Sequence, residues 1–280
     1  MGDREKIQWH PAFQQAMWLE LSEYHKELTF VSEYPLTTEP LRIDTLIIKK
    51  APGARIEKNI GRVFRGHNIV EYKSPRESLT FDDYNKAFAY TYLYASLARV
   101  HPDDLSITFV TSRHPRELLR DLRGDPALRV EPAGGGIYYV AEERMPVQIV
   151  ESKALSKEEN LWLNSLRGNL EKETLRRLIN ECKPRGGDVA AYIHVVLEAN
   201  EKTLKGDVVV GNLAKTLTKN PAFVQEIEKL GYRDLAEPAK RMLRRGDTAK
   251  EVAYALSLSL ERVKKIKKEI EAEQNAAALS

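Results

Sequence analysis

Two neighbouring segments of the sequence decide the fold that we expect for this chain. The first is an apolar strand that contains a single acid, Leu41-Arg42-Ile43-Asp44-Thr45-Leu46-Ile47-Ile48. The second is a strand that ends in Glu-x-Lys, His67-Asn68-Ile69-Val70-Glu71-Tyr72-Lys73. An unpaired carboxylate on so apolar a strand costs several kcal/mol, so Asp44 needs a cation or several hydrogen-bond donors beside it.

Side chains alternate along a strand, so Glu71 and Lys73 share one face and Tyr72 points to the other. If the two strands are neighbours, Asp44, Glu71 and Lys73 can converge. Two carboxylates and a main-chain carbonyl, that of Tyr72, make an all-oxygen site suited to Mg²⁺ or Mn²⁺. A lysine beside such an ion can orient the attacking water or help to deprotonate it. These residue types therefore indicate metal-assisted hydrolysis of a phosphodiester.

Asp44 together with Glu71-x-Lys73 resembles the core signature of the PD-(D/E)XK nucleases. The flanking sequence resembles one branch, the Rpn-like recombination-promoting nucleases, many of which are labelled putative transposases, over about residues 9–165. The chain has Ile43-Asp44 where the superfamily has Pro-Asp, and the carboxylate that would bind the metal is kept. The matching stretches are Trp9-His10-Pro11-Ala12-Phe13, Thr38-Glu39-Pro40-Leu41-Arg42-Ile43-Asp44, Asn59-Ile60-Gly61-Arg62 and His67-Asn68-Ile69-Val70-Glu71-Tyr72-Lys73-Ser74-Pro75.

The resemblance implies an α/β, restriction-endonuclease-like mixed sheet flanked by helices, and a metal-dependent DNA endonuclease linked to recombination or mobile elements. In that superfamily the first helix often adds an acid to the metal site. Residues 11–28 have a helical period, and Glu20 beside its apolar stripe is our candidate, with Glu23 as the second choice and an exposed helix glutamate as the alternative. We also expect a helix over residues 81–97. Superfamily members often place a polar or basic residue of this helix at the active site, so Lys86 is our candidate for contact with nucleic acid.

Glu-x-Lys occurs two more times in the chain, at Glu181 and at Glu151. Glu181 belongs to a helical pattern, in which positions i and i+2 diverge. Glu151 follows a plausible strand over residues 147–150, but no apolar strand with a lone acid precedes it closely. We therefore assign the site to Glu71 and Lys73 and treat Glu151 as a decoy.

The segment between the two key strands, residues 50–66, is strongly basic. Its arginines are Arg55, Arg62 and Arg65, and Glu57 is its one acid. A connection between catalytic strands would lie at the rim of the site, where the phosphates of DNA pass. The alternative is an ordinary solvated face.

Beyond about residue 153 the strand patterns stop and helical periods begin, over residues 158–170, 171–182 and 189–202. Residues 248–263 fit a helix-turn-helix, with Thr248 and Glu251 as a capping box. Arg262 and Lys265 make its second helix basic, as a DNA-contacting helix is, although a small helical packing module explains the pattern equally. The expected organisation is a nuclease-like core at 1–153, a helical extension at 154–235 and this C-terminal segment at 236–280.

Composition limits these interpretations. With 280 residues and 42% hydrophobic residues, the chain can bury a full core. We expect no membrane span and no signal peptide, and therefore a cytoplasmic protein. The single cysteine, Cys182, excludes an internal disulfide and a cysteine-based zinc site. A net charge of +3 does not by itself indicate nucleic-acid binding.

The sequence leaves three alternatives open. The chain could be a DNA-binding or interaction protein with an inactive nuclease fold. It could be an effector that cleaves RNA with the same residues. The chain could also form a homodimer.

Overall fold

The structure, a computed structural model, describes most of the chain up to residue 221 and scattered positions after it. The described residues are 9–31, 46–141, 143–221, 239, 240, 242, 243, 245, 248, 249, 252, 263, 264, 266–268 and 270. The chain divides into two compact units, Met1–Leu217 and Thr218–Ser280.

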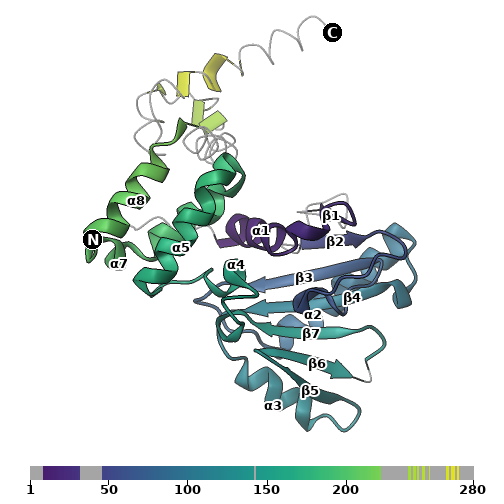
Figure 1. Cartoon of the computed structure of the whole chain (residues 1–280). Coiled ribbons are helices and arrows are strands. Elements are labelled where there is room, and N and C mark those ends of the chain that lie inside the picture. Colours follow the sequence, from purple (N-terminus) through teal and green to yellow (C-terminus); the bar gives the residue numbers. More distant parts are fainter. Residues whose placement is uncertain are drawn as a thin grey trace, which may run out of the picture. The chain divides into compact units, whose positions relative to one another are not determined.

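In the described residues, an N-terminal helix is followed by seven strands with helices α2 and α3 between them, and then by further helices (Figure 1). They are α1 (Trp9–Glu20), η1 (Ser22–Tyr24), β1 (Leu28–Val31), β2 (Leu46–Lys50), η2 (Asn59–Gly61), β3 (His67–Lys73), α2 (Phe81–Ala98), η3 (Pro102–Asp104), β4 (Leu105–Thr111), α3 (Arg116–Gly124), β5 (Arg129–Gly134), β6 (Ile137–Ala141), β7 (Val147–Glu151), η4 (Ser152–Ala154), α4 (Leu161–Asn164), α5 (Lys172–Cys182), η5 (Lys183–Val189), α6 (Ala190–Ala199), α7 (Glu201–Lys205) and α8 (Val208–Thr218).

The seven strands form one mixed sheet in the order β1-β2-β3-β4-β7-β6-β5 (Figure 1). The three central strands, β3, β4 and β7, run parallel, and the remaining pairs are antiparallel. This confirms the expected α/β fold with a mixed sheet and a helical C-terminal region. Gly134, Gly135 and Gly136 have positive φ at the turn that joins the antiparallel strands β5 and β6.

One face of the sheet is covered by α2 and α3 and is apolar. Ile69 of β3, Phe109 of β4 and Ile149 of β7 lie in the same hydrophobic cluster as Tyr84 of α2 and Leu118 of α3. Burial of such aliphatic and aromatic side chains contributes roughly 1.5–3 kcal/mol each, so this cluster holds the two helices on the sheet.

The opposite face carries a row of buried polar side chains that bind the basic segment. Asn68 of β3 donates from Nδ2 to the carbonyls of Ile48 (2.8 Å) and Arg65 (2.9 Å) and accepts at Oδ1 from the Arg65 N–H (2.7 Å). Gln148 of β7 donates from Nε2 to the Ile60 carbonyl at 2.7 Å. Because buried amides need partners, these bonds fix residues 51–66 against this face of the sheet.

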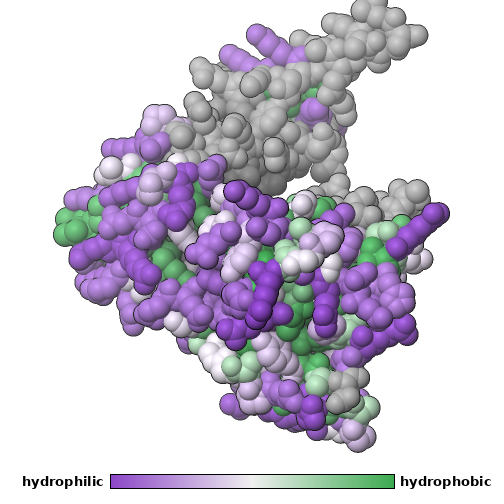
Figure 2. Space-filling model, turned by 45° about the vertical axis from the view of Figure 1, so that its right-hand side comes forward, coloured by the Kyte–Doolittle hydropathy of each residue, from purple (hydrophilic) through white to green (hydrophobic). Residues whose placement is uncertain are grey.

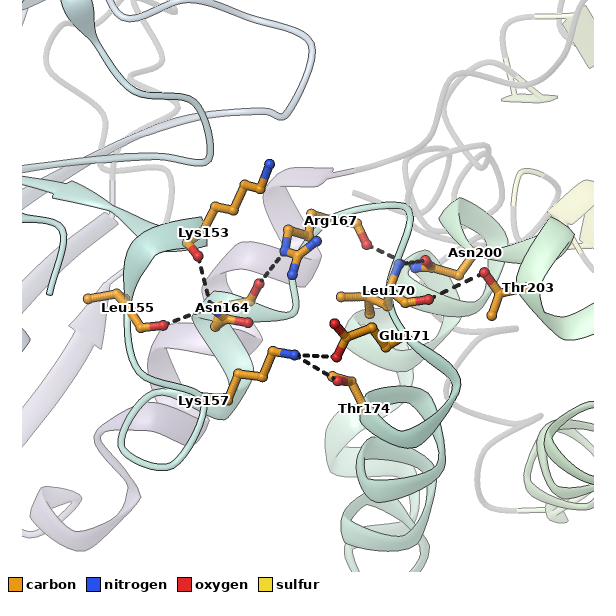
Figure 3. A network of polar contacts seen from close by, with 10 residues as sticks. All are labelled: Lys153, Leu155, Lys157, Asn164, Arg167, Leu170, Glu171, Thr174, Asn200 and Thr203. Atoms are coloured by element: carbon orange, nitrogen blue, oxygen red, sulfur yellow. Dashed lines mark hydrogen bonds and ion pairs between the residues drawn. The ribbon is translucent and has the colours of Figure 1, made fainter.

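The helical region after β7 is joined to the core by polar side chains (Figure 3). The Asn164 amide donates to the main-chain carbonyls of Lys153 (3.1 Å) and Leu155 (2.8 Å). Lys157 contacts Glu171 at 2.7 Å, just before α5. Within residues 158–170 the helix covers only α4, so the longer helix expected there is wrong. The N–H groups of Leu163 and Leu170 donate to the side chains of Glu20 and Asn200.

The second unit has its own apolar cluster. Ala239, Val252, Val263, Ile266 and Ile270 are buried together. Lys264, Lys267 and Lys268 are exposed, which gives the last described helical residues one apolar and one basic side. Arg262 and Lys265 lie outside the described residues, so their expected contact with DNA stays a prediction.

The surface of the described part is mainly hydrophilic. Figure 2 shows purple, hydrophilic residues over most of the face in view, with hydrophobic residues in small separate areas. Among the described residues, no helix combines the length and apolarity that a membrane crossing requires.

Candidate active site

The three parallel strands end in register, and their last residues form one row across the sheet. Lys73 of β3 pairs with Thr111 of β4, and Thr111 pairs with Glu151 of β7. Paired residues of neighbouring strands point to the same face, here the face covered by α2 and α3. Adjacent strands lie about 4.8 Å apart, so the Cα atoms of Lys73 and Glu151 are about 10 Å apart. This carboxyl edge of a parallel sheet is where open α/β folds bind ligands.

Glu71 and Lys73 are side by side at this edge. Lys73 Nζ lies 3.4 Å from Glu71 Oε1, and each side chain is 18% exposed. The prediction that the two side chains share a face is therefore confirmed.

The structure adds an acid that the sequence interpretation missed. Asp83 Oδ1 lies 2.9 Å from Lys73 Nζ. Asp83 is the third residue of α2 and forms a capping box with Thr80, whose side chain accepts a hydrogen bond from the Asp83 N–H while Asp83 accepts from the Thr80 N–H. The spacing Thr80-x-x-Asp83 just after a strand could have located the start of this helix, and with it an acid near the strand end.

The charges in this group favour a protonated lysine. Burial by itself lowers the pKa of Lys73, but the hydrogen bond to Asp83 and the negative charge of Glu71 outweigh it, so that pKa is raised above its ordinary value. Burial tends to raise the pKa of Asp83, but its hydrogen bonds with Lys73 and Thr80 outweigh this effect and lower it. Lys73 is therefore a cation at neutral pH in this arrangement.

Tyr72 points to the opposite face, as the alternation predicted. Its ring stacks on Phe13 of α1, with ring centres 4.2 Å apart and an angle of 8° between the planes. Burial raises the pKa of the Tyr72 hydroxyl. The part of its main-chain carbonyl as a metal ligand stays a prediction.

Asp44 lies outside the described residues. The first described residue of β2, Leu46, pairs with Val70, which directly precedes Glu71. The strand that follows Asp44 in the sequence is therefore the neighbour of the strand that carries Glu71 and Lys73, which is the condition for their convergence.

Glu20 is not brought together with Glu71 and Lys73. It lies at the end of α1, the helix that packs on the Tyr72 face of the sheet, and is buried. Its Oε1 accepts from the Leu163 N–H (2.9 Å), and its Oε2 lies 3.1 Å from Lys58 Nζ. Burial raises the pKa of Glu20, and Lys58 and the hydrogen bonds oppose that shift only in part. We therefore correct its expected place: Glu20 connects α1, the basic segment and α4. The second choice, Glu23, is exposed in η1.

The basic segment packs on the face of the sheet opposite Glu71 and Lys73, and the contact of its arginines with DNA stays a prediction. Its ends join Lys50 to His67, and between them Gln148 of β7 donates to the Ile60 carbonyl at 2.7 Å. In an antiparallel pair the connection lies at one end, and the residues that start β2 and end β3 lie at the other. Two of its arginines contact Glu57: Arg55 pairs with its carboxylate, and Arg62 donates to its carbonyl at 3.3 Å. Arg65 is also exposed.

A different set of cations surrounds the carboxyl edge. They belong to the connections that leave the parallel strands at this edge. Arg113 donates from Nε to the Pro75 carbonyl (2.9 Å), which joins the segments after β4 and β3. The predicted contact residue Lys86 is exposed on α2, one turn after Asp83. The exposed cations of these connections are Arg76 after β3, Arg113 and Arg116 after β4, and Lys153 after β7.

The decoy acid, Glu151, lies at this same edge. Its Oε2 is 2.7 Å from His114 Nδ1, and the His114 ring meets the edge of Tyr138, with ring centres 6.0 Å apart. Sequence reasoning set Glu151 aside because no lone acid precedes it on a nearby strand. Only the parallel pairing of β4 with β7 reveals its position.

The described residues contain no group of three or more His, Cys, Asp or Glu side chains placed to bind one metal ion. Of the predicted ligands, the Glu71 carboxylate and the Tyr72 carbonyl lie on β3, Glu20 lies elsewhere, and Asp44 is outside the described residues. Comparison with family models, curated proteins and solved structures found no match for this chain. Membership of the PD-(D/E)XK nucleases, which the sequence motifs resemble, therefore stays a prediction.

Proposed function

We propose that the chain is a metal-dependent DNA endonuclease that hydrolyses phosphodiester bonds at the carboxyl edge of β3, β4 and β7. The observation that supports this proposal is the pairing of Glu71 with Lys73, 3.4 Å apart, beside the exposed cations of three strand ends. A carboxylate can hold a metal ion, and surrounding cations can hold the phosphates of a nucleic acid.

The metal would be Mg²⁺ or Mn²⁺. Glu71, Asp44 and the Tyr72 carbonyl would hold it, and an all-oxygen set suits such a hard ion. When bound, the ion makes water a better nucleophile and offsets charge on the phosphate. Glu20 is not part of this proposed set, because its carboxylate is held by Lys58 and Leu163.

Lys73 would act as a hydrogen-bond donor. The neighbouring carboxylates of Asp83 and Glu71 favour its ammonium form, so it would orient the attacking water or contact a phosphate oxygen. Asp83 holds the ammonium in place at 2.9 Å. The two carboxylates beside Lys73 thus make it a positioned cation of the site.

The experiment that tests the proposal is nicking of supercoiled plasmid DNA in Mg²⁺, in Mn²⁺ and in EDTA. The wild type is compared with Asp44→Ala, with Lys73→Ala and with Lys202→Ala, a control at an exposed lysine of α7. We expect metal-dependent cleavage that both site variants lose by about 10²-fold or more and that the control keeps. Cleavage that persists in EDTA, or in both site variants, would contradict the proposal.

A second candidate is a nucleic-acid-binding protein without cleavage. It is favoured by one observation, that Lys73 is contacted by both Glu71 and Asp83. Calorimetric titration with Mn²⁺ discriminates the two. Binding that Asp44→Ala abolishes supports the nuclease, whereas no Mn²⁺ binding and no cleavage of DNA or RNA by folded wild type supports the binding protein.

The link to recombination or mobile elements is part of the same proposal. It rests on the sequence resemblance alone. A substrate panel of supercoiled, linear and single-stranded DNA, with RNA beside it, would define the biological class.

A further inference from the structure

His114 and Glu151 form a histidine–carboxylate pair outside the Glu71 and Lys73 group. His114 Nδ1 lies 2.7 Å from Glu151 Oε2. Since a carboxylate accepts hydrogen bonds, Nδ1 carries the proton, and this fixes the orientation of the ring. The His114 side chain is 46% exposed, whereas that of Glu151 is 16% exposed. The pair is thus anchored at its carboxylate and open to solvent at its ring.

The pair belongs to the same edge as the candidate site. Glu151 ends β7 in register with Thr111 and through it with Lys73, and His114 follows β4 by three residues. The backbone before His114 is held in place, because the Arg113 N–H donates to Thr111 Oγ1 at 3.3 Å. α3 begins at Arg116, directly after Pro115. The ring is therefore presented at this edge by a short turn between two packed elements.

We infer that His114, oriented by Glu151, is the general acid that protonates the leaving oxygen in phosphodiester hydrolysis, an inference that rests on the function proposed above. The attacking and leaving oxygens lie on opposite sides of the phosphorus in an in-line reaction. Lys73 ends β3 and Glu151 ends β7, about 10 Å apart across β4 on the same face of the sheet, so a phosphate placed between these strand ends would have the two groups on opposite sides. Histidine suits this part because its ordinary pKa is close to neutral pH.

The step balances as follows. The water oxygen forms a bond to phosphorus and loses a proton to solvent. The bond between phosphorus and the leaving deoxyribose oxygen breaks, and its electron pair stays on that oxygen. The His114 imidazolium gives its Nε2 proton to the same oxygen. The products are a phosphate monoester and a hydroxyl, and neutral His114 then takes up a proton from solvent. Glu151 is a positioning residue, since it acts through the His114 ring.

The test compares two DNA duplexes that differ in one atom. After the cut has been mapped on the wild type, one duplex keeps the leaving oxygen, and the other carries sulfur there, whose departure needs no proton. We expect His114→Ala to slow cleavage of the oxygen duplex about 10²-fold or more and of the sulfur duplex by less than about threefold. Glu151→Gln should show the same pattern with a smaller loss, and Glu151→Asp should restore part of it.

The matched control is His101→Ala. His101 is an exposed histidine that contacts an acid, Asp103, and it precedes β4 at the opposite end of the strand. The His101→Ala variant should cleave both duplexes at the rate of the wild type. Equal slowing of both duplexes by His114→Ala, or slowing of neither, overturns the inference.

A binding measurement separates proton transfer from DNA contact. Fluorescence anisotropy in EDTA gives the affinity of each variant for the uncleaved duplex. A loss of binding by His114→Ala as large as its loss of cleavage overturns the inference and leaves the nuclease proposal standing. A wild type that cleaves neither duplex in Mg²⁺ removes the proposed function itself, and this result is distinct from every outcome of the variants.

Discussion

At the residue scale, the contact between Asp83 and Lys73 should make stability depend on pH. The folded-state pKa of Asp83 is below its ordinary value, so its contribution is present above that value and is lost as pH falls through the folded-state pKa. We expect Asp83→Asn to lower the free energy of unfolding by about 1–2 kcal/mol at neutral pH and by much less near pH 3. Urea unfolding at both pH values measures this difference.

Asp82→Asn is the control for that prediction. Asp82 lies beside Asp83 in the first turn of α2 and is exposed. Its substitution removes the same charge near the helix N-terminus without touching Lys73. Equal losses in the two variants would mean that the helix terminus, and not the contact with Lys73, accounts for the effect.

Glu20 gives a second prediction at this scale, because one of its carboxylate oxygens accepts from the Leu163 N–H and the other contacts Lys58. Glu20→Gln keeps an oxygen that accepts from Leu163 and should leave Mn²⁺ binding unchanged, whereas Glu71→Gln should weaken it roughly tenfold or more. Isothermal calorimetry measures both. Weakened binding in Glu20→Gln equal to that in Glu71→Gln would restore Glu20 as a ligand.

Among the elements, the basic segment is held by side chains of the sheet. Gln148→Leu removes the donor to the Ile60 carbonyl and to Thr108, and it should lower the free energy of unfolding by about 1–3 kcal/mol. Hydrogen exchange of residues 59–64 should rise, because their anchor is lost. Unchanged exchange in this segment would show that other contacts hold it.

At the scale of the whole molecule, the carboxyl edge and the basic segment each offer three exposed cations for a matched comparison. The triple reversal of Arg113, Arg116 and Lys153 to Glu should weaken DNA binding. It should also lower the slope of log affinity against log salt concentration by up to about 2.7, at about 0.9 per lost phosphate contact. Anisotropy in EDTA over a salt series measures both quantities.

The matched comparison is the reversal of Arg55, Arg62 and Arg65 to Glu. It changes the net charge by the same amount, so any long-range effect is equal in the two variants. We expect a smaller loss of affinity and a smaller change in slope, because this segment is fixed to the other face of the sheet. The opposite ranking would place the DNA path along the basic segment.

The sequence by itself determined two local features of the sheet. The alternation of side chains placed Glu71 and Lys73 on one face and Tyr72 on the other. The three glycines between two apolar runs specified the hairpin of β5 and β6. These patterns act over a few residues, and the rest of the fold kept them at these positions.

Only the tertiary structure decided which distant side chains meet. From the sequence we favoured Glu20 as a metal ligand, set Glu151 aside and did not predict Asp83. The packing of α1 on the Tyr72 face removed Glu20 from the edge, the register of β4 with β7 brought Glu151 to it, and the start of α2 brought Asp83. Strand pairing and helix packing join segments far apart in the chain, so the composition of such a site is a property of the folded sheet and is not contained in any one motif.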